Sequence, residues 1–331
     1  MGRCQPGETR DVGTVRSDVA AGRSGLVHEA ALYGSDDELL DMVVPFVSAG
    51  ADAGEPTIVV LDDRRADLVH ATVGGDARVT FLRQDVYYER PARTIRAYRT
   101  VVEQQVAAGA AQVRAVGGVG LANMTSSWDR WSRYEAAIDR ALADLPLWAM
   151  CTYDTRETPD HVLADVDRMH VHFTTPDGRH VESSAGVSAE TVVAGRPPRP
   201  PDPVEARRPD IEMDDPTPAG ARRGILALGR AAGIGDDALD DLRITVSEVV
   251  SNAWLHGRPP VRMRAWAGAD RLVVTVTDHG AGPDDPLVGL VPASGLEPGG
   301  WGLWIAHQLC RDIDLVPTDD AFTVRLTVPV P

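Results

Sequence analysis

A proline-rich segment most constrains how this chain can fold. Between residues 196 and 218, eight of 23 residues are proline. Proline removes backbone hydrogen-bond donors and favours extended conformations, so we expect a semi-stiff linker here. A ligand for a proline-recognition domain is the alternative interpretation of such a composition. A chain of 331 residues is long enough for two domains of roughly 100 to 200 residues each, and this segment would separate them.

The sequence on either side of the prolines divides further. Residues 1–24 are rich in Gly, Arg, Asp and Ser and have no hydrophobic periodicity, so we expect a disordered tail. We expect a first domain over 25–182, the linker over 183–218 and a second domain over 219–331.

The first domain alternates short β-branched runs with longer helical patterns. Buried strands are predicted at 57–63, 79–82, 111–116 and 147–154, and the stretches between them have apolar residues at intervals of three and four. Strands that alternate with helices predict an α/β domain with a parallel sheet covered on both faces.

Several polar and aromatic residues of the first domain are candidates for function. Asp154 ends the last predicted strand, and ligands of parallel sheets bind beyond the carboxyl ends of the strands, so we interpret it as a sensing position. His170 and His172 would share one strand face and could bind a metal, but no third ligand is near in sequence, which favours a structural role. Trp128, Trp131 and Tyr134 recur at helical spacing, which predicts packing against the sheet rather than contact with a ligand.

The second domain has a different order of elements. Helices are predicted over 219–232, 236–256 and about 301–311, and the strands RLVVTVTD and FTVRLTV lie on either side of the third helix. This order predicts an α+β sandwich.

The second helix of this domain has an apolar face and a separate polar row. Leu242, Val246, Val249 and Ala253 share the apolar face. Glu248, Asn252 and His256 follow one another at intervals of four and form the polar row. A carboxylate one turn from an amide can place a general base beside an oxygen ligand for Mg²⁺, although a solvated helix face would have the same pattern.

Two glycine-containing segments follow. Asp278 ends a strand and is followed by Gly280 and Gly282; its carboxylate can accept a hydrogen bond from an exocyclic amine, while the glycines let the backbone approach a ligand. Further on, Gly300 and Gly302 precede or open a helix, where backbone N–H groups suit a phosphate. An ordinary turn and a helix-entry loop are the alternative interpretations.

Charge and composition exclude several classes of function. Asp and Glu number 49 against 33 Lys and Arg, so the formal net charge is −16 and a general nucleic-acid binder is disfavoured. The three cysteines are too few for a disulfide framework, and no apolar run approaches the roughly 20 residues of a membrane span. We therefore expect a cytoplasmic protein that binds neither nucleic acid nor membrane directly.

Together, E-x-x-x-N, D-x-G-x-G and G-G-x-G-L, in this order and spacing, resemble the ATP-binding fold of histidine kinases, gyrase, Hsp90 and mismatch-repair ATPases. SEVVSNAWLHG is most similar to the helix of the anti-sigma-factor serine/threonine kinases. The resemblance implies a Bergerat-type (GHKL) α+β sandwich that binds ATP and Mg²⁺, with a flexible lid from Pro283 to Pro298.

The same resemblance implies a role for each matching residue. Glu248 would be the general base and Asn252 the Mg²⁺ ligand, and Asp278 would bind the adenine amine. The remaining nucleotide contacts would be Gly280 and Gly282 at the base and Gly300 and Gly302 at the phosphates, and Leu303 would be a further nucleotide contact. Arg222 matches a position where these kinases touch their partners.

One feature departs from the histidine kinases. Those enzymes carry a phospho-accepting histidine, normally followed by an acidic residue, on a dimerising helix just before the ATPase domain. The proline-rich segment occupies that place here, and the pair His28–Glu29 lies some 190 residues upstream. Phosphoryl transfer to a protein serine or threonine is therefore favoured.

The first domain resembles the MEDS sensory domain, which implies a RecA-like α/β fold. The resemblance covers about residues 26–180 and rests on the segment from His28 to Asp63, on SWDRWSRYEAAIDRAL and on LWAMCTYD. No G-x-x-x-x-G-K-[ST] loop is present, so the sequence does not support nucleotide hydrolysis by this half.

The leading hypothesis is a signal-responsive, ATP-dependent serine/threonine kinase that regulates a sigma factor by partner switching. The resemblance implies a STAS-domain anti-anti-sigma protein, a sigma factor or both as partners, and it is compatible with a homodimer. An unorthodox sensor histidine kinase and an ATP-gated binding scaffold without catalysis are the alternatives.

Overall fold

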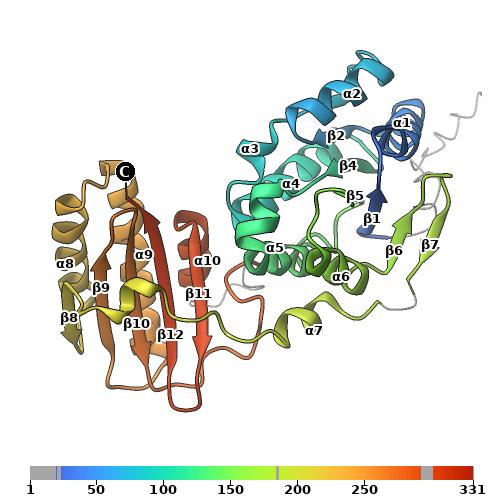
Figure 1. Ribbon diagram of the computed structural model, residues 1–331. Coiled ribbons are helices and arrows are strands. Elements are labelled where there is room, and N and C mark those ends of the chain that lie inside the picture. Colours follow the sequence, from blue (N-terminus) through green and yellow to red (C-terminus); the bar gives the residue numbers. More distant parts are fainter. Residues whose placement is uncertain (1–19, 21–23, 184–185, 292–300, 331) are drawn as a thin grey trace, which may run out of the picture.

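The computed structural model describes residues 20, 24–183, 186–291 and 301–330, which form two units joined by an extended segment (Figure 1). The tail predicted over residues 1–24 lies almost entirely outside the described residues. None of the helices in the described ranges is both long and apolar enough to cross a lipid bilayer.

The first unit is built around a seven-stranded sheet. Its strands are β1 (Val27–Tyr33), β2 (Thr57–Val60), β3 (Val79–Phe81), β4 (Val113–Gly117), β5 (Leu147–Asp154), β6 (His172–Thr174) and β7 (His180–Glu182). Its helices are α1 (Asp36–Asp52), α2 (Asp63–Val73), α3 (Gln84–Tyr87), α4 (Pro91–Ala107), α5 (Leu121–Ala141), α6 (Asp160–Met169) and α7 (Ala189–Ala194).

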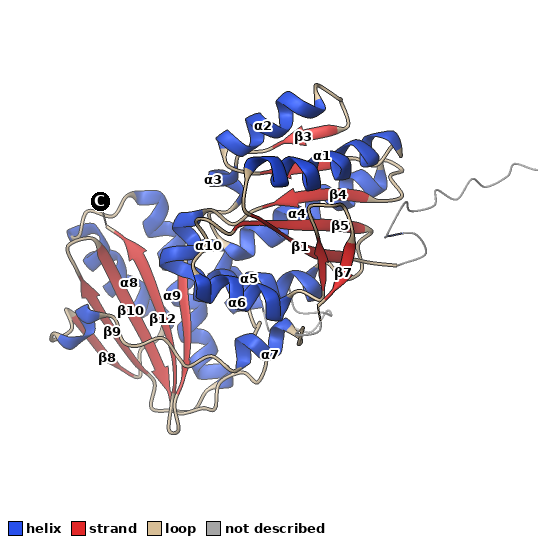
Figure 2. Cartoon of the chain, turned by 45° about the vertical axis from the view of Figure 1, so that its right-hand side comes forward, coloured by secondary structure: helices blue, strands red, loops and turns tan. Residues whose placement is uncertain are grey.

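This sheet has the order β3-β2-β4-β5-β1-β6-β7, and every neighbouring pair is parallel except β6 with β7. Helices cover both faces (Figure 2). On β2, Val59 packs in the core under α1 while Ile58 and Val60 pack in the core under α4 and α5, because successive strand residues point to opposite faces. The prediction of a parallel sheet covered on both faces is confirmed, whereas the RecA-like likeness stays a prediction.

The aromatic residues of α5 pack as expected. Trp128, Trp131 and Tyr134 are all buried in the core between α5 and the sheet. The prediction that they are packing residues is confirmed.

The second unit is an antiparallel sheet with helices on one face (Figure 1). Its strands are β8 (Ile211–Asp214), β9 (Arg262–Ala267), β10 (Arg271–Asp278), β11 (Asp312–Pro317) and β12 (Phe322–Pro329), in the order β11-β12-β10-β9-β8. Its helices are α8 (Pro218–Ala231), α9 (Asp236–His256) and α10 (Trp301–Leu309). The α+β sandwich is therefore as predicted.

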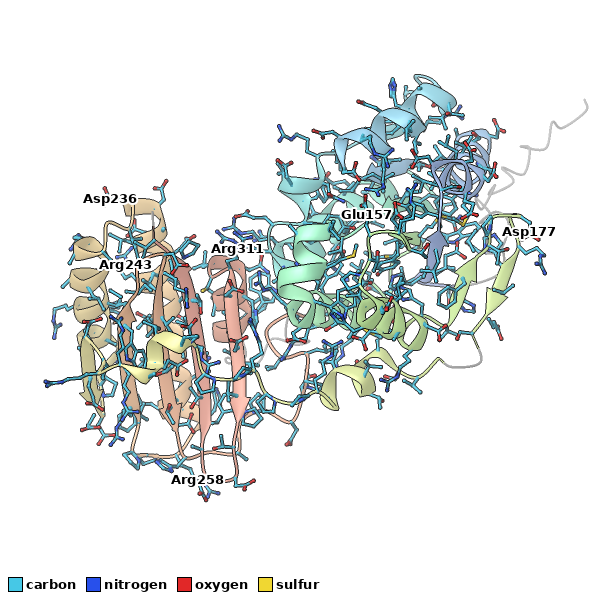
Figure 3. All side chains as sticks on the ribbon, viewed as in Figure 1. Glu157, Asp177, Asp236, Arg243, Arg258 and Arg311 are labelled. Carbon is cyan, nitrogen blue, oxygen red and sulfur yellow. The ribbon has the colours of Figure 1, made fainter. Side chains whose placement is uncertain are left out.

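Helix α9 spans this unit from end to end. Asp236, its first residue, lies at one end of the unit, and Arg258, just past its last turn, lies at the other (Figure 3). Leu242, Val246 and Val249 are buried against the sheet, so the predicted apolar face is the core face. The polar row consequently lies away from the centre of the core.

The proline-rich segment contains structure that its composition does not suggest. A 3₁₀ helix spans Pro203–Ala206, and β8 pairs with β9 as the edge strand of the second sheet, Ile211 opposite Ala265. Ile211 and Met213 pack against the apolar core, while Glu212 and Asp214 face outward. An edge strand tolerates flanking prolines because one side of it needs no ladder hydrogen bonds. Ordered structure of the second unit thus begins within the range predicted as linker.

Candidate functional site

The polar row of α9 lies beside the start of α10. Glu248 and Asn252 are both half-buried and one helical turn apart. A Cβ atom at Gly302 would lie 2.9 Å from the amide of Asn252 and 3.0 Å from Oε2 of Glu248. Glycine at position 302 therefore lets α10 approach both groups, and it brings the first and third sequence motifs together.

Asp278 is held in one orientation by backbone donors. Its side chain is only 5% exposed at the end of β10. Oδ1 accepts hydrogen bonds from the backbone N–H groups of Gly280 at 2.7 Å and Arg258 at 3.2 Å. Among the described residues no donor contacts Oδ2, so this oxygen can accept a hydrogen bond from a ligand.

Two glycines allow the backbone to close around this carboxylate. A Cβ atom at Gly257 would lie 2.3 Å from Asp278 Oδ1. Gly282 has a φ of +74°, and a Cβ atom there would lie 2.4 Å from the ring of Phe322. A side chain at either position would fill space that the fold keeps narrow.

A cavity of about 310 Å³ lies among α9, β10, β12 and α10. Asn252, Asp278, Gly282 and Leu303 line it, so four of the predicted nucleotide contacts share one space. The apolar wall consists of Val249, Ala253, Val276, Pro283, Val288, Leu303, Phe322 and Val324. An apolar slot with one buried carboxylate suits a flat heteroaromatic ring that carries an amine.

The other predicted contacts stand as follows. Glu248 and Gly302 adjoin Asn252, and Gly280 adjoins Asp278. Gly300 lies outside the described residues, as does much of the predicted lid. Phe322 and Val324 were not predicted as site residues, because a strand pattern gives no signal for which of its buried residues faces a ligand.

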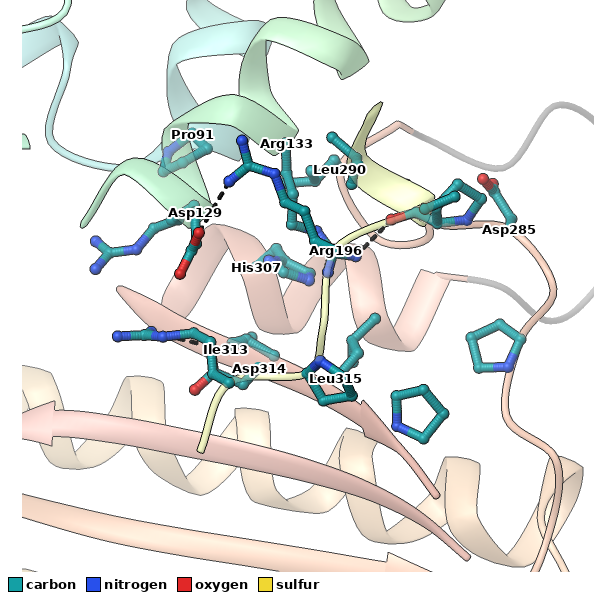
Figure 4. Close-up of a pocket in the computed structure, with 18 of the residues that line it drawn as sticks. Pro91, Asp129, Arg133, Arg196, Asp285, Leu290, His307, Ile313, Asp314 and Leu315 are labelled. Atoms are coloured by element: carbon teal, nitrogen blue, oxygen red, sulfur yellow. Dashed lines mark hydrogen bonds and ion pairs between the residues drawn. The ribbon is translucent and has the colours of Figure 1, made fainter. Parts of the chain in front are cut away.

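The described part of the lid packs against the first unit. Leu287 and Leu290 are buried in the same apolar cluster as residues of α5 and α7. Arg133 on α5 donates a hydrogen bond to the carbonyl of Pro286 (Figure 4). Arg140, also on α5, pairs with Asp285 at 2.7 Å. The flexible lid predicted from the sequence is thus docked at its N-terminal part.

Two titratable side chains at the docked lid, Asp285 and His307, have shifted pKa values. Burial would raise the pKa of Asp285, but hydrogen bonds from Arg140 and from the Leu287 amide hold that pKa below its ordinary value. His307 of α10 packs against the lid, since a Cβ atom at Gly289 would lie 2.5 Å from its ring. Burial lowers the pKa of His307 to about 3, so this histidine is neutral at physiological pH.

The first unit also contacts the C-terminal end of α10. Arg90 donates to the carbonyls of Gln308 and Leu309 at 3.2 and 2.8 Å, and Arg93 donates to that of Gln308 at 2.7 Å. Cations at a helix C-terminus satisfy the last carbonyls and interact favourably with the helix dipole. The first unit therefore holds both the lid and the helix that follows it.

The remaining two predicted residues lie outside this cavity. Asp154, at the carboxyl end of β5, lines a separate cavity of about 150 Å³. Hydrogen bonds from Arg156, and also from Arg65, hold the pKa of Asp154 well below its ordinary range. Arg222 on α8 donates to the hydroxyl of Ser247 at 3.0 Å. The sensing role of Asp154 and the partner contact of Arg222 stay predictions.

Two family models each match one part of the chain. Residues 27–171 match MEDS, the methanogen/methylotroph, DcmR sensory domain, and residues 212–328 match the histidine kinase-like ATPase domain. The second match begins at β8, in agreement with the pairing of that strand. No curated protein matches the chain.

Two solved structures are similar to part of the chain. The RsbU and RsbW domains of a Mycobacterium tuberculosis protein are 23% identical over 38% of this chain and 33% of that one, with a TM-score of 0.25. The histidine kinase domain of the E. coli osmosensor EnvZ is 17% identical over 38% of this chain and 91% of that one, with a TM-score of 0.24. The chain thus spans about a third of the length of the first structure.

Proposed function

Because the chain joins an N-terminal MEDS domain to a C-terminal histidine kinase-like ATPase domain, we propose that it is a signal-responsive, ATP-dependent serine/threonine protein kinase of the anti-sigma type. It binds Mg-ATP in the second unit and regulates a sigma factor by partner switching. The observation that carries this proposal is the meeting of Asn252, Asp278 and Leu303 around one cavity, with Glu248 one helical turn from Asn252 and beside Gly302.

The residues of the site fit Mg-ATP. The apolar slot holds the adenine, and Oδ2 of Asp278 accepts a hydrogen bond from its amine. The amide oxygen of Asn252 is the protein ligand for Mg²⁺, which keeps its other ligands from water and phosphate. ATP supplies the phosphoryl group, and Mg²⁺ neutralises charge on the phosphates.

Glu248 acts on the acceptor. Its carboxylate is within one helical turn of the Mg²⁺ ligand and accepts the proton of the attacking hydroxyl group. The glycine at 302 keeps this carboxylate uncovered by a side chain of α10. The acceptor hydroxyl belongs to a serine or threonine of a STAS-domain partner, for which Arg222 is the proposed contact.

The position of His28 and the segment before α8 support a hydroxyl group, rather than a histidine, as the acceptor of the phosphoryl group. His28 lies on strand β1 and not on a helix, and its side chain is only 7% exposed and bonded to Asp139 and Cys151. Among the described residues between β7 and α8, the one α-helix is the six-residue α7. Such a helix is too short for a dimerising coiled coil.

The contacts of the first unit support signal response. Arg133 and Arg140 bind the lid, and Arg90 binds the end of α10, so a change in the sensory domain alters the elements that close over the nucleotide. This arrangement makes lid position the proposed regulated step.

Mass spectrometry tests the reaction. The full chain is incubated with ATP, Mg²⁺ and a STAS-domain protein from its own genome, beside the variants Glu248→Gln and Glu212→Gln. Glu212 lies on the exposed face of β8 and pairs with Arg264, so it is a matched control of the same chemistry. We expect phosphoserine or phosphothreonine on the partner with the parent and Glu212→Gln, and a strong loss with Glu248→Gln.

Other outcomes favour the alternatives. Acid-labile phosphate on the chain itself would support the sensor histidine kinase. ATP binding without any phosphorylation would support the scaffold.

A further inference from the structure

Four side chains of types that bind metals meet inside the first unit, outside the proposed ATP site. They are His28 of β1, Glu135 of α5, Cys151 of β5 and His170, which follows α6. One donor atom from each lies within 4.8 Å of every other. Because the four come from four elements, the fold and not local sequence brings them together.

Four of the six separations between donor atoms are close to those of a tetrahedral metal shell. His28 Nε2 lies 3.2 Å from Cys151 Sγ and 3.7 Å from Glu135 Oε2. Glu135 Oε2 lies 3.8 Å from His170 Nε2 and 3.9 Å from Cys151 Sγ. Ligands of tetrahedral Zn²⁺ at bond lengths of about 2.0 to 2.3 Å are about 3.3 to 3.8 Å apart. Binding would thus require only small movements.

Three of the four side chains are oriented by a second contact outside the cluster. His28 Nδ1 lies 2.9 Å from Asp139 Oδ1, and His170 Nδ1 lies 3.1 Å from the carbonyl of Val166. A carbonyl can only accept, so Nδ1 of His170 carries the proton and Nε2 has a free lone pair. Tyr153 donates to Oε1 of Glu135 at 3.1 Å, which leaves Oε2 toward the cluster. Metal-binding histidines have this outer arrangement.

Two observations indicate that a cation belongs in this cluster. Nε2 of His170 is buried without a hydrogen-bond partner, in a side chain that is 1% exposed. Glu135 is equally buried and has no Arg or Lys partner among the described residues. The buried Glu55 differs, since it pairs with Arg114 at 2.6 Å. A buried carboxylate is costly unless a cation or strong donors compensate it.

We propose that His28, Glu135, Cys151 and His170 bind one divalent transition-metal ion, with Zn²⁺ the preferred ion. A thiolate, two imidazoles and one carboxylate are all donors that tetrahedral Zn²⁺ accepts. Cys151 loses its thiol proton on binding. A cavity of about 300 Å³, lined by His28, Asp139 and His170 among others, provides a path from the surface.

Cobalt spectroscopy tests this site in the full chain. The background is Cys4→Ser with Cys310→Ser, so that Cys151 is the one remaining thiol. After removal of bound metal with a chelator, the protein is titrated with Co²⁺. We expect one equivalent to bind with a thiolate-to-cobalt charge-transfer band and the intense visible bands of four-coordinate cobalt, and Zn²⁺ to displace it.

Three variants assign the ligands and guard against misfolding. Cys151→Ser should remove the charge-transfer band. Asp139→Asn keeps all four ligands but replaces the charged acceptor for His28 with a neutral amide, so the band should persist while Co²⁺ affinity falls about 10- to 100-fold. His172→Gln is the matched control, since His172 lines the same cavity but is not one of the four, and it should bind Co²⁺ as the background protein does.

The proposal is overturned if the folded background protein binds no Co²⁺ at micromolar concentrations. It is also overturned if the charge-transfer band survives Cys151→Ser, or if His172→Gln weakens binding as much as Asp139→Asn.

Discussion

Replacing Leu287 by alanine should undock the lid from the sensory domain. Leu287 is fully buried, at 0% exposure, in the apolar cluster that α5 and α7 share with the lid. Truncation of a buried leucine to alanine costs about 2 to 5 kcal/mol. Since the apolar contact crosses between the two units, this free energy is lost from docking more than from folding of either unit.

The charged contacts at the same place should matter less. Arg140 and Asp285 are 36% and 42% exposed, so water screens their attraction. Exposed ion pairs contribute about 0 to 1 kcal/mol. Arg140→Ala is therefore expected to change lid docking by less than about tenfold, which corresponds to 1.4 kcal/mol, whereas Leu287→Ala changes it by at least about 30-fold.

Hydrogen exchange measures this difference. The amides of Val288 and Leu290 bond to the carbonyls of Asp285 and Leu287 at 3.2 and 3.0 Å, so they report opening of the lid. Their exchange should accelerate strongly in Leu287→Ala and little in Arg140→Ala. Ile225→Ala, which truncates a side chain of equal burial inside the second unit, is the control for general destabilisation. Unchanged exchange at Val288 and Leu290 in Leu287→Ala would refute the reasoning.

Three further predictions concern the ATP site. Asn252→Ala should weaken Mg-ATP binding by more than about tenfold, since it removes the protein ligand for Mg²⁺, and calorimetry that found parental affinity would contradict this assignment. Glu248→Gln keeps the shape and should preserve ATP binding while it slows phosphoryl transfer by about 10²- to 10⁴-fold; a single-turnover assay with unchanged transfer would remove Glu248 from the reaction. GTP should bind more weakly than ATP by about 1 to 3 kcal/mol, because guanine carries an oxygen where adenine carries its amine, and Asp278 would then have no hydrogen bond to accept. Equal affinities in a competition assay would argue against adenine at Asp278.

The local pattern of apolar residues was sufficient to predict most of the helices and strands. The helices at 218–231 and 236–256 and the strand at 271–278 agree closely with their predicted ranges, because apolar periodicity over 8 to 20 residues is a local property. Strand β8 was missed although Ile211 and Met213 alternate with acidic residues, since the surrounding prolines indicate a linker. Its partner β9 lies about 50 residues away, and no local pattern reveals that pairing.

That several motif residues share one cavity of the second unit was predictable for a related reason. Glu248 and Asn252 are one turn apart on a helix, and Asp278 and Gly302 lie in short motifs of fixed order. These residues belong to short motifs of nearly consecutive positions, so the motifs can be recognised before the fold is known. Phe322 and Val324 of the apolar wall belong to no such motif, because the sequence pattern of a strand does not distinguish a buried residue that faces a ligand from one that faces the core.

The sequence by itself determined the α/β and α+β character of the two units, the types of most of their elements and the motif residues proposed to bind ATP. Only the tertiary structure decided that the lid docks on α5 and that His28, Glu135, Cys151 and His170 share one buried space. The physical reason is that contacts between distant residues depend on strand order and on how the helices cover the sheet. His170 shows the difference most plainly: the sequence favoured a structural role for His170 and His172 because no third ligand was near, whereas the fold places His170 beside side chains of β1, α5 and β5.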